Sequence, residues 1–327
     1  MVTRPTVLCP IDLSEPSRAA LRYASAIAEH FCAELTLLTV SEPLVTEAIE
    51  MKTGTTWFAD EATRTLRKFF DDTFPHGTPD GIHVTFEATR GKAAPAILES
   101  AREHGCDIIV MSTHGLTGLR KVFFGSTTER VLRETTLPVL VTPPHDPGQM
   151  ALDDFPGVVR HVLAPVDLTS ATARQVVVAR ALADALGVPL LLLHVVEPVE
   201  SRAFEKGRLE PVAAARAAGA RRTIAEMVSS IPGRVRAEGL VLQGRPPEVI
   251  ASVARERAAG LIIMGLHNPA GVGPRMGSVT YQVLCRIPAL VLALPPAAPA
   301  AGHDVASPAL EEISARIQGE SLLPAAP

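Results

Sequence analysis

A stretch of the chain rich in glycine and hydroxyl side chains, MSTHGLTGLRKVFFGSTTERVL, lies at residues 111–132. Gly115 and Gly125 let the backbone approach a bound group closely, because they carry no Cβ that would collide with it. Ser126 and a segment with helical periodicity follow Gly125, so a helix is expected to begin there. The first N–H groups of a helix are free and lie at the positive end of its dipole, which favours phosphate. The stretch therefore predicts a backbone cradle for a small anion.

The start of that helix has the spacing of a capping box, with Ser126 followed three residues later by Glu129. The pattern predicts that the Ser126 side chain caps the helix and that Glu129 reaches back to it. The hydroxyls of Ser126, Thr127 and Thr128 would add hydrogen-bond donors for an anion. The alternative is purely structural, since a glycine-rich loop often only turns the chain and a Gly-Ser pair often only caps a helix.

An acidic residue, Asp12, follows the apolar run at residues 7–11. In an open parallel sheet, ligands bind outside the carboxyl ends of the strands, where the strand order reverses. If the first strand neighbours the fourth, Asp12 faces the loop at residues 112–125. A carboxylate repels phosphate, so Asp12 is expected to accept a hydrogen bond from a ribose hydroxyl or a base amine. Alternatively, Asp12 only stabilises a turn before Ser14.

The segments that must position these residues alternate between strand and helix. Short apolar runs with little polar alternation are typical of parallel strands buried on both faces, and they occupy residues 7–11, 35–40, 82–88, 107–111 and 139–142. Residues 16–31 have helical spacing with Ser14 as the expected N-cap, and a later helix opens near Pro95 and stops at Gly105. This alternation predicts a doubly wound α/β fold.

The whole pattern occurs twice. VLCPIDLSEPSRAALRYASAIAEHF at residue 7 recurs as VLAPVDLTSATARQVVVARALADAL at residue 162, and later segments match in the same order. We therefore expect one nucleotide-binding domain at residues 1–144, a second domain at 158–296 and a flexible tail at 297–327. Residues 143–157 have the composition of a linker. The last strand of each copy is short, apolar and bounded by prolines, as an exposed strand edge that needs a controlled partner would be.

Composition and motifs exclude several other functions. A net charge of −4 gives no reason to bind nucleic acid, and no apolar run approaches the roughly 20 residues of a membrane helix. The N-terminus has no signal-peptide pattern, so a soluble, cytoplasmic protein is expected. The four cysteines are scattered and are expected to be buried or half-buried reduced thiols. There is no GxxxxGK[ST], GxSxG or HExxH motif, so neither a catalytic centre nor a metal site is predicted.

With these motifs the chain resembles the universal stress protein family in its tandem form. The family signature is a glycine, two residues, a glycine, nine residues, then glycine and serine or threonine. The first copy has Ser112 in place of the first glycine, then Gly115, nine residues, Gly125 and Ser126. The resemblance implies contacts with adenine and ribose from Pro10, Asp12 and Val40. It implies contacts with the phosphates and the nearby sugar from Met111, Ser112, Gly115, Gly125, Ser126 and Thr127.

The resemblance also implies an assembly, since family members commonly pair through the edge formed by the last strand. The two copies are therefore expected to form an internal pseudo-dimer, which could dimerise again.

The resemblance implies a function as well. Family members with the signature typically bind ATP, here with Mg²⁺, and the expected role is stress-response signalling through contacts with an unidentified protein partner. No positioned base or arginine finger is evident in the sequence, so ATP is expected to be a ligand and any hydrolysis slow. Two alternatives are a nucleotide-independent interaction protein with relic loops and a weak ATP-hydrolysing enzyme.

The second copy has a degenerate loop. It keeps matching residues at the positions that the family uses for adenine, ribose and the start of the helix. These residues are Pro165, Asp167, Val195, Gly265, Gly277 and Ser278. However, Asn268 replaces the middle glycine, and the spacer is one residue shorter and contains Pro274. The sequence therefore predicts one ATP per chain, bound by the first copy.

Overall fold

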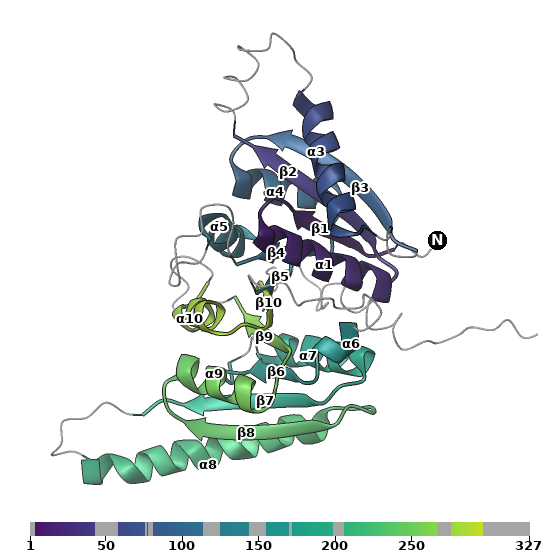
Figure 1. Ribbon diagram of the computed structural model, residues 1–327. Coiled ribbons are helices and arrows are strands. Elements are labelled where there is room, and N and C mark those ends of the chain that lie inside the picture. Colours follow the sequence, from purple (N-terminus) through teal and green to yellow (C-terminus); the bar gives the residue numbers. More distant parts are fainter. Residues whose placement is uncertain are drawn as a thin grey trace, which may run out of the picture.

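The computed structural model describes residues 4–42, 58–75, 77, 81–113, 125–143, 155–169, 172–198, 206–266 and 276–296. Within these residues, strands and helices alternate along the chain in two similar halves (Figure 1). The strands of both halves belong to one sheet of 10 strands, with helices on both of its faces. The α/β fold class predicted from the alternating pattern is confirmed.

The first half contains five strands and their connecting helices. In chain order they are β1 (Thr6–Pro10), α1 (Glu15–His30), β2 (Glu34–Ser41), α3 (Phe58–Thr73), β3 (His83–Arg90), α4 (Ala93–Glu103), β4 (Ile108–Ser112), α5 (Ser126–Glu134) and β5 (Val139–Thr142). The second half repeats this order after a short helix, α6 (Phe155–Val158), at the end of the expected linker. Its elements are β6 (Val162–Pro165), α7 (Thr172–Leu186), β7 (Leu190–Val196), α8 (Lys206–Ser230), β8 (Ala237–Gln243), α9 (Pro246–Glu256), β9 (Leu261–Gly265), α10 (Ser278–Arg286) and β10 (Leu290–Leu294).

The two halves join through their last strands. The strand order is β3-β2-β1-β4-β5-β10-β9-β6-β7-β8. β10 pairs with β5 in antiparallel register, with Leu292 opposite Leu140, whereas the other neighbouring strands are parallel. The pairing covers strand edges that would otherwise be open to another chain. The internal pseudo-dimer predicted from these two strands is confirmed.

Two apolar layers enclose the sheet, and each spans both halves. One layer packs α1, α3, α7 and α8 on one face, with Leu21, Leu66 and Val178 among its buried side chains. The other packs α4, α5, α9 and α10 on the opposite face, with Ile97 and Val283 among its members. Both faces of the central strands are therefore covered, as their continuous apolar sequences require.

The third strand of the first half differs from expectation. The run at residues 82–88 was predicted to be buried on both faces, but β3 has no fully buried residue and its two ends are exposed. β3 lies at the edge of the sheet, where it pairs with β2 alone. The apolar composition of the run did not distinguish an edge strand from a central one.

The N-cap expected for α1 is present. The Ser14 side chain accepts a hydrogen bond from the N–H of Ser17 at 3.2 Å, and its own hydroxyl donates to Asp12 Oδ1 at 2.5 Å. Behind this cap, Ala20, Ala24 and other small side chains on one face of α1 are fully buried. The cap fixes where the helix leaves the loop that carries Asp12.

We expect Ser14→Ala to lower the free energy of unfolding by about 1 kcal/mol, because it removes the acceptor for a helix N–H. Urea unfolding followed by circular dichroism measures this change. Ser14→Thr keeps a hydroxyl cap and should lose much less. Equal stability of the alanine variant and the unchanged protein would contradict the role of the cap.

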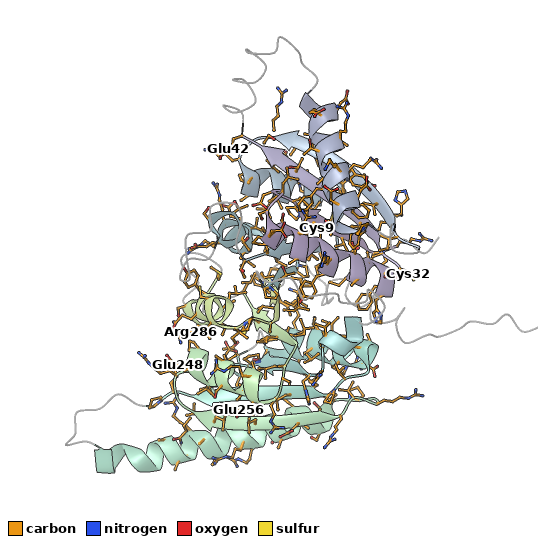
Figure 2. The ribbon with its side chains drawn as sticks, in the orientation of Figure 1. Cys9, Cys32, Glu42, Glu248, Glu256 and Arg286 are labelled. Atoms are coloured by element: carbon orange, nitrogen blue, oxygen red, sulfur yellow. The ribbon has the colours of Figure 1, made fainter. Side chains whose placement is uncertain are left out.

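The cysteines are only partly as expected. Cys9 and Cys106 are buried, but Cys32 and Cys285 are exposed, so the prediction of four buried or half-buried thiols is wrong for two of them. Cys32 lies at the surface beyond the end of α1, while Cys9 lies in the interior (Figure 2). Burial, helped by the carboxylates of Asp107 and Glu87, raises the pKa of Cys106 to about 12, and burial also raises the pKa of Cys9.

These positions predict two reactive and two unreactive thiols. The thiolate is the nucleophile, so a raised pKa and burial both slow alkylation at pH 8. Iodoacetamide should label Cys32 and Cys285 in the folded protein, and Cys9 and Cys106 only after unfolding in denaturant. Peptide mass spectrometry identifies the labelled sites. Rapid labelling of Cys106 in the folded protein would show that this part of the core opens.

Within the described residues, no helix combines the length and the hydropathy that a membrane span requires.

Candidate functional site

The first half contains a cavity of about 310 Å³ at the point where the strand order reverses. β1 pairs with β2 on one side and with β4 on the other, so the condition for placing Asp12 near the loop after β4 is met. The cavity collects eight of the nine residues predicted for the site: Pro10, Asp12, Val40, Met111, Ser112, Gly125, Ser126 and Thr127. The ninth, Gly115, lies outside the described residues.

Asp12 is held in a tight turn at the mouth of this cavity. Its Oδ1 accepts hydrogen bonds from the N–H of Ser14 at 3.1 Å and from the Ser14 hydroxyl at 2.5 Å. Between them, Leu13 has a φ of 65°, a left-handed conformation that is uncommon for a residue other than glycine. The turn that was the structural alternative for Asp12 is therefore present, and the exposed carboxylate also lines the cavity.

The helix that follows the loop begins where the sequence indicated, but its cap differs. The N-cap of α5 is Gly125, and no side chain makes a capping hydrogen bond. Ser126 is therefore the first helical residue, which shifts Glu129 past the capping-box position. Glu129 instead accepts hydrogen bonds from Arg133 Nη2 at 2.6 Å and Nε at 3.1 Å. The capping box was wrong, because the extended backbone of Gly125 ends the loop one residue earlier.

The absence of that cap matters for the chemistry of the cavity. Gly125 has no side chain that could cap the N-terminal turn of α5, and the residues of this turn line the cavity, so their free N–H groups are placed to meet an anion there. The turn is fixed in place from behind, since the Thr128 hydroxyl donates to the carbonyl of Ser112 at 2.8 Å. The N–H of Gly125 also donates to the carbonyl of Thr113 at 2.7 Å. A rigid helix terminus of this kind is a preorganised anion site.

Sequence reasoning missed part of the lining. The additional residues are Ile11, Ser17, Leu38, Glu42, Ala93 and Ile97. Glu42 follows the end of β2, as shown in Figure 2, and Ala93 and Ile97 come from α4 on the far side of the cavity. The repeat itself held a signal for Glu42, because the SEP after the second strand of the first copy aligns with VEP in the second. No comparable local signal marked α4.

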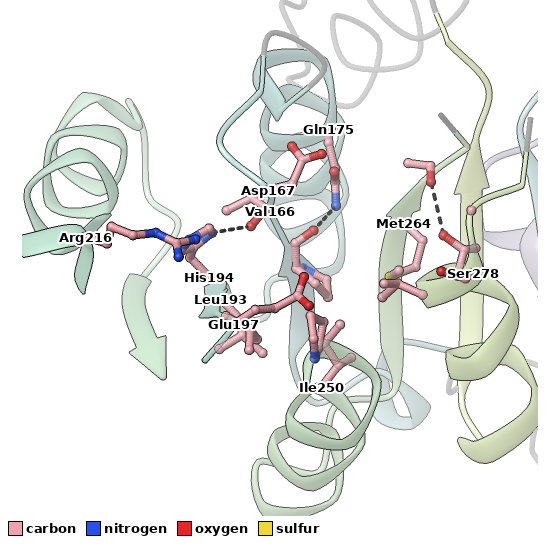
Figure 3. Close-up of a pocket in the computed structure, with 17 residues that line it drawn as sticks. Val166, Asp167, Gln175, Leu193, His194, Glu197, Arg216, Ile250, Met264 and Ser278 are labelled. Atoms are coloured by element: carbon pink, nitrogen blue, oxygen red, sulfur yellow. Dashed lines mark hydrogen bonds between the residues drawn. The ribbon is translucent and has the colours of Figure 1, made fainter. Parts of the chain in front are cut away.

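The second half contains the corresponding cavity, and it is larger, at about 460 Å³ (Figure 3). Asp167 occupies the position of Asp12 and forms the same turn, with its Oδ1 accepting from the N–H of Thr169 at 3.0 Å. Leu168, like Leu13, has a positive φ, of 63°. α10 is capped by the glycine Gly277 without a side-chain hydrogen bond, as α5 is. The described framework of the two sites is therefore alike.

The loop after β9, which the sequence predicts to be degenerate, is not among the described residues. Asn268 and Pro274 lie outside the described residues, so the degenerate-loop prediction is not tested. The capping-box spacing itself does not separate the halves. Ser126 is followed three residues later by Glu129 and Ser278 by Tyr281, but α5 and α10 both begin after a glycine N-cap without a side-chain capping bond.

The chain is a tandem pair of doubly wound α/β domains. Each domain has a cavity at its switch point, and the N-terminus of a helix lines that cavity. This arrangement is typical of folds that bind nucleotides. The family model for the universal stress protein family matches residues 3–143 and 159–295. The chain belongs to the universal stress protein family, as the sequence motifs predicted.

Individual relatives support the same assignment. Universal stress protein MJ0531 of Methanocaldococcus jannaschii is 29% identical over 144 residues, which cover 41% of this chain and 79% of that protein. A universal stress protein of Thermus aquaticus is 34% identical over 132 residues, covering 40% of this chain and 95% of its own. Each of these relatives aligns with about one half of the tandem.

Solved structures match the whole tandem. A universal stress protein from Archaeoglobus fulgidus has a TM-score of 0.58 at 20% identity, covering 89% of this chain and 96% of its own. The functionally unknown protein PA1789 from Pseudomonas aeruginosa has a TM-score of 0.61 at 17% identity, covering 97% and 98%. These two likenesses concern the fold. A further universal stress protein, solved in complex with cAMP, has a TM-score of 0.31 at 25% identity and covers 43% of this chain and 98% of its own.

Proposed function

We propose that this protein binds ATP in the cavity of its first half and changes its contacts with other proteins when that cavity is filled. The observation that carries the proposal is the uncapped N-terminal turn of α5, which faces the same cavity as Asp12. The turn suits phosphate, and the carboxylate suits a ribose hydroxyl or a base amine. Apolar side chains such as Val40 and Ile97 line the rest and suit a planar base.

The residues present fit Mg²⁺ only as a companion of the nucleotide. Within the described part of the chain, no three His, Cys, Asp or Glu side chains lie close enough together to hold a metal ion. Mg²⁺ commonly binds through substrate phosphates and few protein ligands. In this proposal the ion would be held mainly by the phosphates of ATP.

We also propose that ATP is a ligand rather than a substrate. The described lining of the first cavity contains the carboxylates of Asp12 and Glu42 but no Lys, Arg or His. Phosphoryl transfer depends on positive charge that stabilises the transition state and on a group that orients the attacking water. With no positively charged side chain among these residues, any hydrolysis should be slow, and product formation at substantial turnover would favour the enzymatic alternative.

Thermal unfolding with and without Mg-ATP tests the proposal. A ligand present at 100 times its Kd stabilises the folded state by about 2.7 kcal/mol, which raises Tm by roughly 4 °C for a protein of this size. A nucleotide-independent interaction protein would show no change, and that result would overturn the proposal. If Tm rises, mass spectrometry of small molecules that co-purify with the protein identifies the physiological nucleotide.

A further inference from the structure

The two cavities differ in two places: at the end formed by the helix N-terminus (α5 in the first half, α10 in the second) and at the end away from that helix. At the helix end, the second cavity has fewer hydroxyls, because Gly265 and Val279 stand where the first has Ser112 and Thr127. Hydroxyls are donors to phosphate oxygens, so the helix end of the second cavity offers an anion less than that of the first.

At the other end, the second cavity gains basic groups. His194 stands where the repeat has Thr39 in the first copy, and Arg216 comes from α8. Figure 3 shows His194 and Arg216 at one end of the cavity and Ser278 at the other. No ion pair of Arg216 is found within the described residues, so its guanidinium is available to a ligand.

The hydrogen bond of His194 fixes what its ring offers. Its Nδ1 lies 2.8 Å from the carbonyl oxygen of Val166, which can only accept, so Nδ1 carries the proton. In the neutral ring, Nε2 is then an acceptor and suits a ligand hydroxyl. Arg216, in the lining of the same cavity, suits a phosphate or carboxylate.

The acidic groups of the two cavities are matched. Asp167 and Glu197 occupy the positions of Asp12 and Glu42, so both cavities contain the same two carboxylates. Oδ1 of Asp167 is already engaged by the hydroxyls of Thr169 at 2.8 Å and Thr172 at 3.1 Å. Glu197 repels an anion as Glu42 does, so among the described lining residues the cation of Arg216 is the charge that differs between the two sites.

Gln175 is a further difference between the two cavities. It replaces Ala20 of the first copy, is 4% exposed, and lines the cavity. Its Nε2 donates to the carbonyl oxygens of Pro165 at 2.7 Å and Ile263 at 2.6 Å, which ties β6 to β9. The side chain therefore adds a fixed amide to the lining of the second cavity, where the first copy has only the methyl group of Ala20.

We propose that the second cavity binds a different ligand from the first: a nucleotide-sized molecule with an acidic group at the end away from α10. A nucleoside 3′,5′-bisphosphate has this chemistry. Its 3′-phosphate would meet Arg216, and the neighbouring 2′-hydroxyl would donate to Nε2 of His194. This inference goes beyond ATP binding by the first half and does not depend on it.

Titration of the full chain with adenosine 3′,5′-bisphosphate and with AMP tests the inference, with hydrogen–deuterium exchange locating the bound site. The bisphosphate should protect residues 190–198 and 213–220 and bind there about 10- to 100-fold more tightly than AMP, as expected for one charge-assisted contact. Arg216→Ala should remove this preference, and Arg222→Ala, on the same helix but outside the cavity, should keep it.

A second variant tests the imidazole. His194→Asn keeps an N–H for the Val166 carbonyl but removes the Nε2 acceptor, so it should weaken bisphosphate binding without changing the melting temperature. Equal affinity for bisphosphate and AMP, or a preference that survives Arg216→Ala, would overturn the inference. Protection by ATP at residues 125–134 reports on the first cavity separately, so its absence would count against the proposed function alone.

Discussion

Gly125→Glu should abolish ATP binding, with at least a 100-fold loss of affinity and an unchanged fold. Gly125 lines the first cavity and caps α5, so a glutamate there places bulk and negative charge where the phosphates are proposed to lie. The backbone tolerates the change, because Gly125 has a φ of −60°, which any residue adopts. Isothermal titration with Mg-ATP measures the loss, and circular dichroism checks the fold.

The repeat supplies a matched control for this variant. Gly277 caps α10 as Gly125 caps α5 and also lines its cavity. Gly277→Glu adds the same charge and bulk to the second half, so it should leave the tight ATP site intact. Retained ATP affinity in Gly125→Glu, or equal losses in both variants, would count against the cavity of the first half as the ATP site.

Isothermal titration of the intact chain should give one tight ATP site rather than two. The described residues supply part of the reason, because Thr127 and Ser112 offer hydroxyls that Val279 and Gly265 lack. Each charge-assisted hydrogen bond contributes about 1.5 to 3 kcal/mol, so losing two weakens binding by roughly 100-fold or more. The prediction from Asn268 and Pro274, outside the described residues, points the same way.

A pair of reciprocal substitutions tests the cause of this asymmetry. Thr127→Val should weaken the tight site by about 10-fold or more, since it removes one hydroxyl donor and preserves the shape of the side chain. Val279→Thr should leave that site unchanged. Two equivalent tight sites in the unchanged protein would refute the asymmetry. The intact chain is the proper sample, because separating the halves would expose the β5 and β10 edges that pair with each other.

Local sequence determined much of the architecture. Continuous apolar runs predicted β1, β2, β4 and β5 to within a residue or two, and the cap at Ser14 is as expected. The repeat predicted two halves, and the proline-bounded last strands predicted how they join. These features follow from periodicity, capping and edge protection, which are properties of short segments. The spacing of the glycine and hydroxyl residues pointed to Gly125 and Ser126, and the family resemblance implied other lining residues of the first cavity, such as Pro10 and Val40.

Other features depended on contacts between segments far apart in the chain. The strand order places β3 at the edge of the sheet. It also brings α4 and Glu42 to the first cavity, and it sets β6 beside β9, where Gln175 links the two strands. The N-cap of α5 is Gly125 rather than the predicted Ser126. Two hydrogen bonds fix the position of this helix, one from Thr128 to the carbonyl of Ser112 in β4 and one from Gly125 to the carbonyl of Thr113. The sequence by itself determined two similar nucleotide-binding-type halves. Only the tertiary structure decided their different cavities, because Arg216 and His194 come from separate elements that packing brings to one end.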